Sequence, residues 1–208
     1  MRKNIIFCTC ILISLCASFS IAQNSDSAEA DSWNVSAEGD FNFTDPFFIL
    51  PIVTADKNKL HLEARYNYEE LKTFSGWIGY NFSGGKEFEF KVTPMGGFLL
   101  GRITGFAPGL EIQLEYSGFE FYSESEYVFD TEDKENNFYY NWTDLTYSPA
   151  DWLFFGFSAQ RTKAYETDLD IQRGFLIGGS FAYMELSGYC FNPGTDDLYF
   201  LLALSSEF

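Results

Sequence analysis

Residues 59–69, KLHLEARYNYE, decide the fold of this chain. Charged and polar side chains occupy the odd positions, and apolar or aromatic side chains occupy the even ones. A period of two predicts a β-strand with one apolar and one polar face, because successive side chains of a strand point to opposite sides. On a helix, Leu60 and Tyr66 would instead lie on conflicting faces.

The same alternation recurs along most of the chain, and no window of useful length has helical periodicity. Turn-forming runs separate the alternating stretches, as at residues 83–86 (SGGK) and 192–195 (NPGT). We therefore predict an all-β chain of about ten strands. The expected strands lie near residues 33–43, 59–69, 73–83, 86–100, 108–128, 136–147, 152–164, 168–179, 181–191 and 197–208.

Two places leave the strand number open between eight and twelve. Segment 47–55, FFILPIVTA, is interrupted by Pro51, so it could be a loop, a bent strand or a plug. Four glycines between residues 96 and 105 predict a turn or a bulge. No repeat, low-complexity tract or linker argues for a second domain. Residues 23–208 are therefore expected to form a single antiparallel up-and-down β-barrel.

Residues 1–22 are typical of a cleaved secretory signal peptide. Arg2 and Lys3 form a positive start, an apolar run follows, and residues 20–22 (SIA) place small side chains at the cleavage site. A membrane anchor is disfavoured because the apolar run is on the short side for a membrane span. A lipoprotein would need a small residue before Cys16, where a leucine stands.

The composition combines high acidity with high aromatic content. The 208 residues include 13 Lys and Arg, 30 Asp and Glu, and 20% aromatics, with a net charge of -17. This charge disfavours nucleic-acid binding through a basic face, and 46% hydrophobic residues disfavour a disordered acidic chain. Removing the signal peptide leaves 11 basic and 30 acidic side chains, a net charge of -19, and Cys190 as the remaining cysteine. The expected mature domain therefore has no internal disulfide.

Alternating strands fit two barrels that are inside-out versions of each other. A soluble barrel turns its apolar face inward, whereas a membrane barrel turns it toward lipid. The signal peptide, the aromatic apolar face and strands of about 10–12 residues favour the membrane. Connections also alternate between the short turn at 148–151 and the long charged segment 130–137. Four tryptophans near expected strand ends suggest aromatic girdles: Trp33, Trp77, Trp142 and Trp152.

The last eleven residues, LYFLLALSSEF, carry a family resemblance. Leu198, Phe200, Leu202 and Leu204 are in phase, and the segment ends on Phe208. This segment resembles the C-terminal strand of Gram-negative outer-membrane β-barrel proteins of the small, porin-like kind. The resemblance implies an outer-membrane location, insertion from the periplasm by the barrel assembly machinery, and a barrel able to stand as a monomer. The resemblance of the other strands is only general, and no particular subfamily is indicated.

In a membrane barrel, the polar face would line the lumen. Acids outnumber bases there, which allows either an ion-pair network filling a narrow barrel or a cation-favouring pore lining. Ten strands would leave little open width. The lumen-lining candidates are Glu38, Asp40, His61, Glu63, Arg65, Glu69, Glu87, Glu89, Lys91, Glu111, Gln113 and Glu115.

An enzyme is the less favoured alternative. His61 is the only histidine, and Glu63 on the same face could orient its ring. Some small outer-membrane barrels are lipid-modifying hydrolases, but their sites face lipid, whereas His61 lies on the polar face. No G-x-S-x-G motif is present, and the acids between 130 and 135 lack the spacing of a calcium loop. We expect no catalytic residue, cofactor or metal site.

Three basic residues fall on the apolar face. Arg161 and Lys163, near the outer end of a strand, are candidates for contact with lipid headgroups, including lipopolysaccharide phosphates. Arg173 would face lipid unless a local bulge turns it away. The expected partners are therefore outer-membrane lipids and lipopolysaccharide, with no nucleic acid. The oligomeric state is open, with a monomer favoured.

Overall fold

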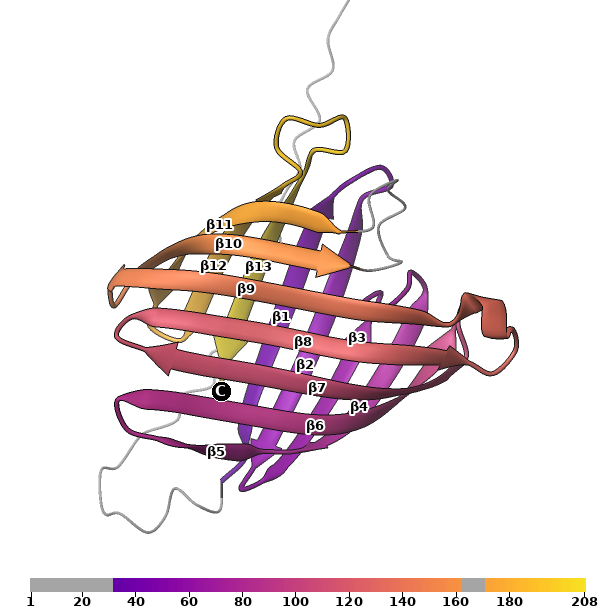
Figure 1. The fold of residues 1–208 in the computed structure, drawn as a ribbon, viewed down its shortest axis with the longest axis horizontal. Coiled ribbons are helices and arrows are strands. Elements are labelled where there is room, and N and C mark those ends of the chain that lie inside the picture. The colour runs from indigo at the N-terminus through magenta and orange to yellow at the C-terminus, as the bar shows by residue number, and fades with distance from the viewer. Residues whose placement is uncertain (1–31, 162–170) are drawn as a thin grey trace, which may run out of the picture.

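The strands of this chain form one antiparallel sheet that closes into a barrel (Figure 1). The computed structural model describes residues 32–161 and 171–208. The strands are β1 (Asn34–Phe43), β2 (Phe48–Lys57), β3 (Leu60–Tyr66), β4 (Thr73–Tyr80), β5 (Phe82–Gly85), β6 (Phe88–Gly101), β7 (Gly105–Tyr116), β8 (Phe119–Asp130), β9 (Phe138–Ala150), β10 (Leu153–Arg161), β11 (Gln172–Phe181), β12 (Met184–Phe191) and β13 (Tyr199–Glu207).

The barrel closes where its first strand meets its last. Strand β1 pairs with β13, and β6 pairs with both β4 and β5. Because β4 and β5 are two halves of one wall strand interrupted at Asn81, the barrel has twelve strand positions. In Figure 1, β6–β10 form the near wall and β1–β4 the far wall. The antiparallel up-and-down barrel predicted from the sequence is confirmed, with a strand number at the upper limit of the expected range.

Two segments account for the difference between ten and twelve strands. Segment 47–55 is neither loop nor plug, because all of it except Phe47 lies in β2. Pro51 is tolerated there opposite Gly39 of β1, where the pairing of β2 with β3 has already ended. The expected long strand 108–128 is in fact β7 and β8. A two-residue turn divides it at Ser117 and Gly118, whose φ angles of 50° and 80° suit a tight hairpin.

Connections at the two ends of the barrel differ in length. At one end, which we call the turn end, every hairpin has two residues: 58–59, 86–87, 117–118, 151–152 and 182–183. The first and last strands also begin and end there, since Ser36 pairs with Glu207. The opposite end, the loop end, carries the longer connections, among them 131–137 with one turn of 3-10 helix at Lys134–Asn136. No helix in the described residues is long and apolar enough to cross a membrane.

The outer surface of the barrel is apolar. Ile78 and Phe157 are each 61% exposed, and large hydrophobic side chains are exposed on every wall. Aromatic pairs lie near both rims, such as Tyr80 with Phe82 near the turn end, their ring centroids 4.7 Å apart. A soluble barrel would have the reverse arrangement. The exterior is therefore that of a barrel built to lie in lipid.

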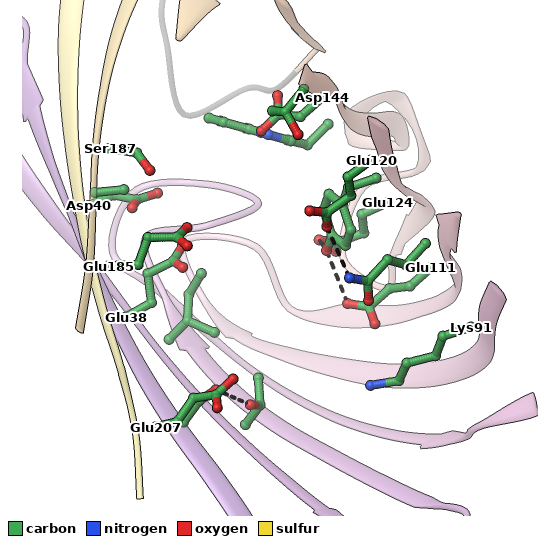
Figure 2. A pocket seen from close by; sticks show the side chains of 18 of the residues that line it. Glu38, Asp40, Lys91, Glu111, Glu120, Glu124, Asp144, Glu185, Ser187 and Glu207 are labelled. Carbon is green, nitrogen blue, oxygen red and sulfur yellow. Dashed lines mark hydrogen bonds between the residues drawn. The ribbon is translucent and has the colours of Figure 1, made fainter. Parts of the chain in front are cut away.

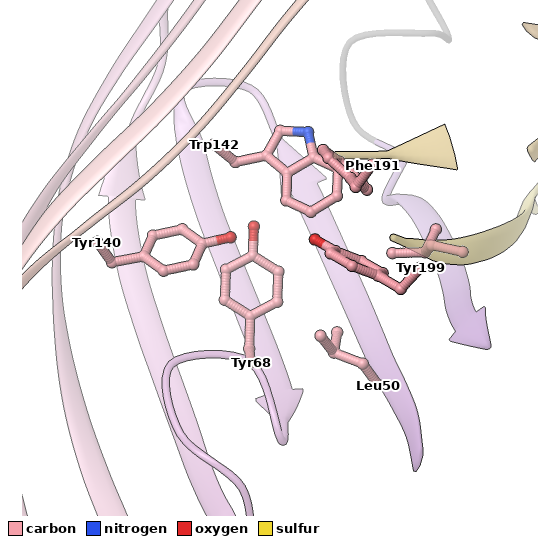
Figure 3. Close-up of a cluster of buried hydrophobic side chains, with 7 residues drawn as sticks. Leu50, Tyr68, Tyr140, Trp142, Phe191 and Tyr199 are labelled. Atoms are coloured by element: carbon pink, nitrogen blue, oxygen red, sulfur yellow. The ribbon is translucent and has the colours of Figure 1, made fainter. Parts of the chain in front are cut away.

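The loop-end half of the interior holds two clusters of apolar side chains, beside buried polar side chains such as Glu69, Glu126 and Gln160. One cluster, which we call the aromatic layer, spans the lumen (Figure 3). Figure 3 shows the hydroxyl groups of Tyr68, Tyr140 and Tyr199 pointing toward the middle of this layer. A second cluster lies beside it, consisting of Trp77, Met95, Leu99, Ile103, Ala107 and Val128. The aromatic layer consists of Leu50, Tyr68, Tyr140, Trp142, Phe191, Tyr199 and Leu201.

The interior tryptophans correct one expectation. Trp33 and Trp152 are exposed, as girdle residues are, but Trp77 and Trp142 are buried inside the barrel. Trp77 fits inside because it pairs with Gly97 of β6, which has no side chain to occupy the same space. The turn or bulge expected between residues 96 and 105 is a turn at residues 102–104, and the pairing of β4 with β6 continues unbroken through Gly96 and Gly97.

Candidate functional site: the acidic vestibule

A cavity of about 590 Å³ occupies the turn-end half of the lumen. We call it the vestibule. Asn34, Ser148 and Glu207 line it near the turn end, and Tyr68 and Trp142 of the aromatic layer line its inner end. The interior is therefore divided into a polar chamber and a packed half, because the inward-facing positions change from polar to apolar along several strands.

Carboxylates face one another across the vestibule (Figure 2). Glu38 of β1 and Glu185 of β12 lie on one wall, and Glu111 of β7 and Glu120 of β8 lie on the opposite wall. Basic lining residues are few among the described residues: Arg65, Lys91 and the histidine His61. Acidic side chains therefore outnumber basic ones in the lining of the chamber.

Arg65 of β3 is buried at the inner end of the vestibule. Its Nε donates to Glu63 Oε2 at 2.5 Å, and Nη1 forms an ion pair with Glu124 Oε1 of β8. The guanidinium carbon lies 4.5 Å from the ring centroid of Tyr68, whose hydroxyl donates to Glu124 at 2.7 Å. Nη1 also lies 3.8 Å from Glu126 Oε1, a longer ion pair. One cation thus joins β3 to the opposite wall through several carboxylates.

His61 lies beside this network with both ring nitrogens engaged. Its Nδ1 is 2.8 Å from Asp56 Oδ1 of β2, and its Nε2 is 2.7 Å from Glu63 Oε1. Asp56 also accepts from Asn81 and from Lys91 Nζ, at 2.8 and 3.1 Å. The neighbours of His61 are therefore carboxylates, and the ring is held in a fixed orientation.

Most of the lumen-lining candidates named from the sequence lie together. The vestibule lining includes Glu38, Asp40, His61, Glu63, Arg65, Lys91, Glu111 and Gln113. Glu87 is outside the lining because it sits in the tight turn 86–87. Glu89 and Glu115, which pair with each other close to the turn end, are exposed and also outside it. Glu69 lies beyond the vestibule, where its Oε1 accepts from Ser75 and Trp77.

Sequence reasoning missed the carboxylates of β8. Glu120 and Glu124 line the vestibule, and Glu126 is buried behind them. A two-residue turn pairs Tyr116 with Phe119, so inward-facing residues have odd numbers before the turn and even numbers after it. The Ser117-Gly118 dipeptide was the signal that could have revealed this change.

Arg161 and Arg173, two of the basic residues expected on the apolar face, lie near the loop end. Arg161 is exposed at the last position of β10, and Lys163 lies outside the described residues. Arg173 is exposed near the start of β11 and pairs with Ala159 without a bulge. The expected bulge is therefore wrong; the position near the strand end instead leaves Arg173 close to the barrel rim. It borders a surface depression lined by Phe157, Ile171, Phe175 and Pro193 among others.

Comparisons with known proteins agree with this architecture. No protein-family model matches the chain, and no curated protein matches its sequence. A solved structure described as "KdgM porin" is similar with a TM-score of 0.58 and 10% identity, over 84% of this chain and 99% of that one. The outer-membrane protein Omp33 of Acinetobacter baumannii has a TM-score of 0.47 and 13% identity, over 85% and 97% of the two chains.

The similarity covers nearly the whole length of the porin structure. At 10% sequence identity, it supports a shared fold only. It agrees with the closed antiparallel sheet and the apolar exterior described above. The chain therefore has the fold of a porin-like outer-membrane β-barrel, the kind of protein that its C-terminal strand resembles.

Proposed function

We propose that this protein is an outer-membrane barrel whose vestibule takes up cations from the periplasm and whose aromatic layer restricts passage to the outside. The two-residue hairpins and the chain ends would lie in the periplasm, and the longer connections outside, as in other bacterial barrels. Export by residues 1–22 and insertion through the C-terminal strand β13 belong to the same proposal.

The observation that carries the proposal is the one-sided charge of the vestibule. Glu38, Glu185, Glu111 and Glu120 face a cavity of about 590 Å³, with Arg65 and Lys91 as its permanent cations among the described residues. Rings of carboxylates favour cations over anions, because the negative potential lowers the free energy of a cation in the lumen.

The aromatic layer supports the restriction of passage. Tyr140, Phe191 and Leu201 are at most 2% exposed, which leaves the loop-end half filled by side chains. Packing of this kind excludes hydrated solutes, because a narrow barrel is filled by its own side chains. We therefore expect a low conductance for the wild-type barrel.

Planar-bilayer recordings in a salt gradient test both parts. Trp142→Ala should raise single-channel conductance, because it removes a large side chain from the aromatic layer. The reversal potential of the Trp142→Ala variant should indicate cation preference. Adding Glu38→Gln and Glu185→Gln to this variant should weaken that preference.

Two matched controls accompany this test. Trp152→Ala removes an exterior tryptophan that is 63% exposed, and Glu87→Gln neutralises a carboxylate outside the vestibule. Neither should change conductance or selectivity. Anion preference, or a wild-type conductance equal to that of Trp142→Ala, would contradict the proposal.

We also infer that the outer surface near the loop end contacts lipid headgroups. Arg173 lies among apolar side chains at the rim, and Arg161 is exposed at the end of the neighbouring strand β10. Long basic side chains at such positions extend toward phosphate groups while their stems contact acyl chains. Lipopolysaccharide phosphates are the partner that this arrangement favours.

A further inference from the structure

We propose that His61, Glu63 and Glu111 form a binding site for a divalent transition-metal ion in the vestibule. One ligand atom from each residue lies within 4.8 Å of the others. His61 Nε2 is 2.7 Å from Glu63 Oε1 and 3.9 Å from Glu111 Oε2. Tetrahedral zinc holds such atoms about 3.3 Å apart. Each of the two distances to His61 Nε2 would have to change by about 0.6 Å, which the glutamate torsions can supply.

The imidazole of His61 is oriented as in many metal sites. Nδ1 lies 2.8 Å from Asp56 Oδ1 and Nε2 lies 2.7 Å from Glu63 Oε1. With a metal ion in place of the proton on Nε2, Nδ1 would carry the ring proton and donate it to Asp56. Asp56 is itself held by Asn81 Nδ2 at 2.8 Å and Lys91 Nζ at 3.1 Å. A carboxylate bound to the far ring nitrogen fixes the tautomer and raises the basicity of the metal-binding nitrogen.

Arg65 positions the two glutamates from the other side. Its Nε contacts Glu63 Oε2 at 2.5 Å, and its Nη2 lies 3.8 Å from Glu111 Oε1. The remaining oxygens, Oε1 of Glu63 and Oε2 of Glu111, are those nearest His61 Nε2. Each carboxylate therefore has one oxygen engaged by Arg65 and one facing the imidazole.

The ligand set indicates the class of ion. One imidazole and two carboxylates suit zinc and other divalent first-row metals better than calcium or magnesium, which prefer oxygen ligands alone. All three residues line the vestibule, so an ion could arrive from the turn end and keep open coordination positions there. Its charge would also offset the excess of carboxylates around Arg65 and Lys91.

This inference deepens the proposed function by giving the vestibule a specific occupant. The two can fail separately, because metal binding is measured at equilibrium in detergent and cation preference is measured in a bilayer. If the barrel prefers cations in the bilayer but does not bind zinc, the metal site is wrong and the vestibule proposal still holds.

Zinc competition with a chromophoric chelator tests the site on the full mature barrel, folded in detergent and freed of metal. We expect about one tight equivalent per chain. His61→Ala should abolish it, and Asp56→Asn should weaken it about 10- to 100-fold. X-ray absorption of the zinc-loaded protein should show imidazole in the first coordination shell.

Controls separate a built site from diffuse binding to carboxylates. Glu185→Gln neutralises a vestibule acid on the opposite wall that is not a proposed ligand, so it should reduce zinc affinity much less than Glu111→Gln. If His61→Ala fails to fold, Glu111→Gln carries the test, because its side chain is partly exposed and it changes one ligand. Affinity unaffected by His61→Ala or Glu111→Gln, or equally reduced by Glu185→Gln, overturns the proposal, as does the absence of saturable binding.

Discussion

Arg65 is the residue on which the interior of the barrel depends most. Its guanidinium is fully enclosed and lies among Glu63, Glu124 and Glu126, which come from strands on opposite walls. A buried ion pair contributes little by itself, because desolvation offsets the attraction. Removing one partner is costly, because the charges left behind remain buried and unpaired.

We therefore expect Arg65→Met to lower the free energy of unfolding by about 3–5 kcal/mol. Urea unfolding of the barrel in lipid vesicles, followed by tryptophan fluorescence, measures this. Adding Glu124→Gln to Arg65→Met should recover part of the lost unfolding free energy, because it removes one carboxylate charge that is buried without a partner.

Arg102→Met is the control for this prediction. Arg102 is 54% exposed in its side chain and lies 3.7 Å from Glu70, a pair expected to contribute about 0–1 kcal/mol. If Arg65→Met were no more destabilising than Arg102→Met, the central role of Arg65 would be wrong.

At the scale of elements, the pairing of β4 with β6 shows how the interior accepts a tryptophan. Gly97 lies directly opposite Trp77, and a methyl group built on Gly97 would be 2.4 Å from the indole ring. Its neighbour Gly96 points to the other face, where a methyl group would meet nothing within 4 Å. The two adjacent glycines therefore have different reasons to be there.

Gly97→Ala should destabilise the barrel by about 1–3 kcal/mol, because the added methyl group forces Trp77 out of its position. The midpoint of urea unfolding should fall accordingly, and the fluorescence of the folded protein should change. Gly96→Ala should leave both unchanged. Equal effects of the two substitutions would show that backbone flexibility, and not the space beside Trp77, is what these glycines provide.

At the scale of the whole molecule, the apolar exterior and the closed sheet imply a location. A barrel that exposes Phe155, Phe157, Phe175 and Ile177 on adjoining strands would aggregate in water. In lipid, the same surface is stable, because a closed sheet has no open edge whose backbone groups would be left unpaired.

The protein should consequently be recovered from the outer-membrane fraction and migrate faster on gels before heating than after it. A folded barrel resists detergent at room temperature and unfolds when heated, so the two bands distinguish its states. Recovery of the mature chain from the periplasm without detergent would instead support a soluble barrel.

The alternation of side chains let the sequence predict much of the fold. Residues 59–69 placed His61, Glu63 and Arg65 on one face, and the structure has all three inside the barrel. The charged connection expected at 130–137 and the short turn expected at 148–151 lie at opposite ends, at residues 131–137 and 151–152. These features are local, since each depends on side chains a few residues apart.

Other features depended on contacts that the pattern does not encode. A strand has the same period whether its inward face is polar or apolar. Trp77 and Trp142 were expected outside because they lie near expected strand ends, and the period could not show that they face inward. The turn at 117–118 reversed the inward-facing positions of β8 and concealed Glu124. Such errors arise because alternation defines two faces without naming which is inside.

The sequence by itself determined the antiparallel barrel, because this follows from the period of two along each strand. The aromatic character of the apolar face and the resemblance of the C-terminal strand, rather than the period, indicated that the apolar face lies outward. Only the tertiary structure decided that the interior is half vestibule and half packed core, and that Glu111 and Glu124 meet His61 and Arg65. Those contacts join β3 to β7 and β8 across the lumen, and barrel closure brings together residues about 50–60 positions apart.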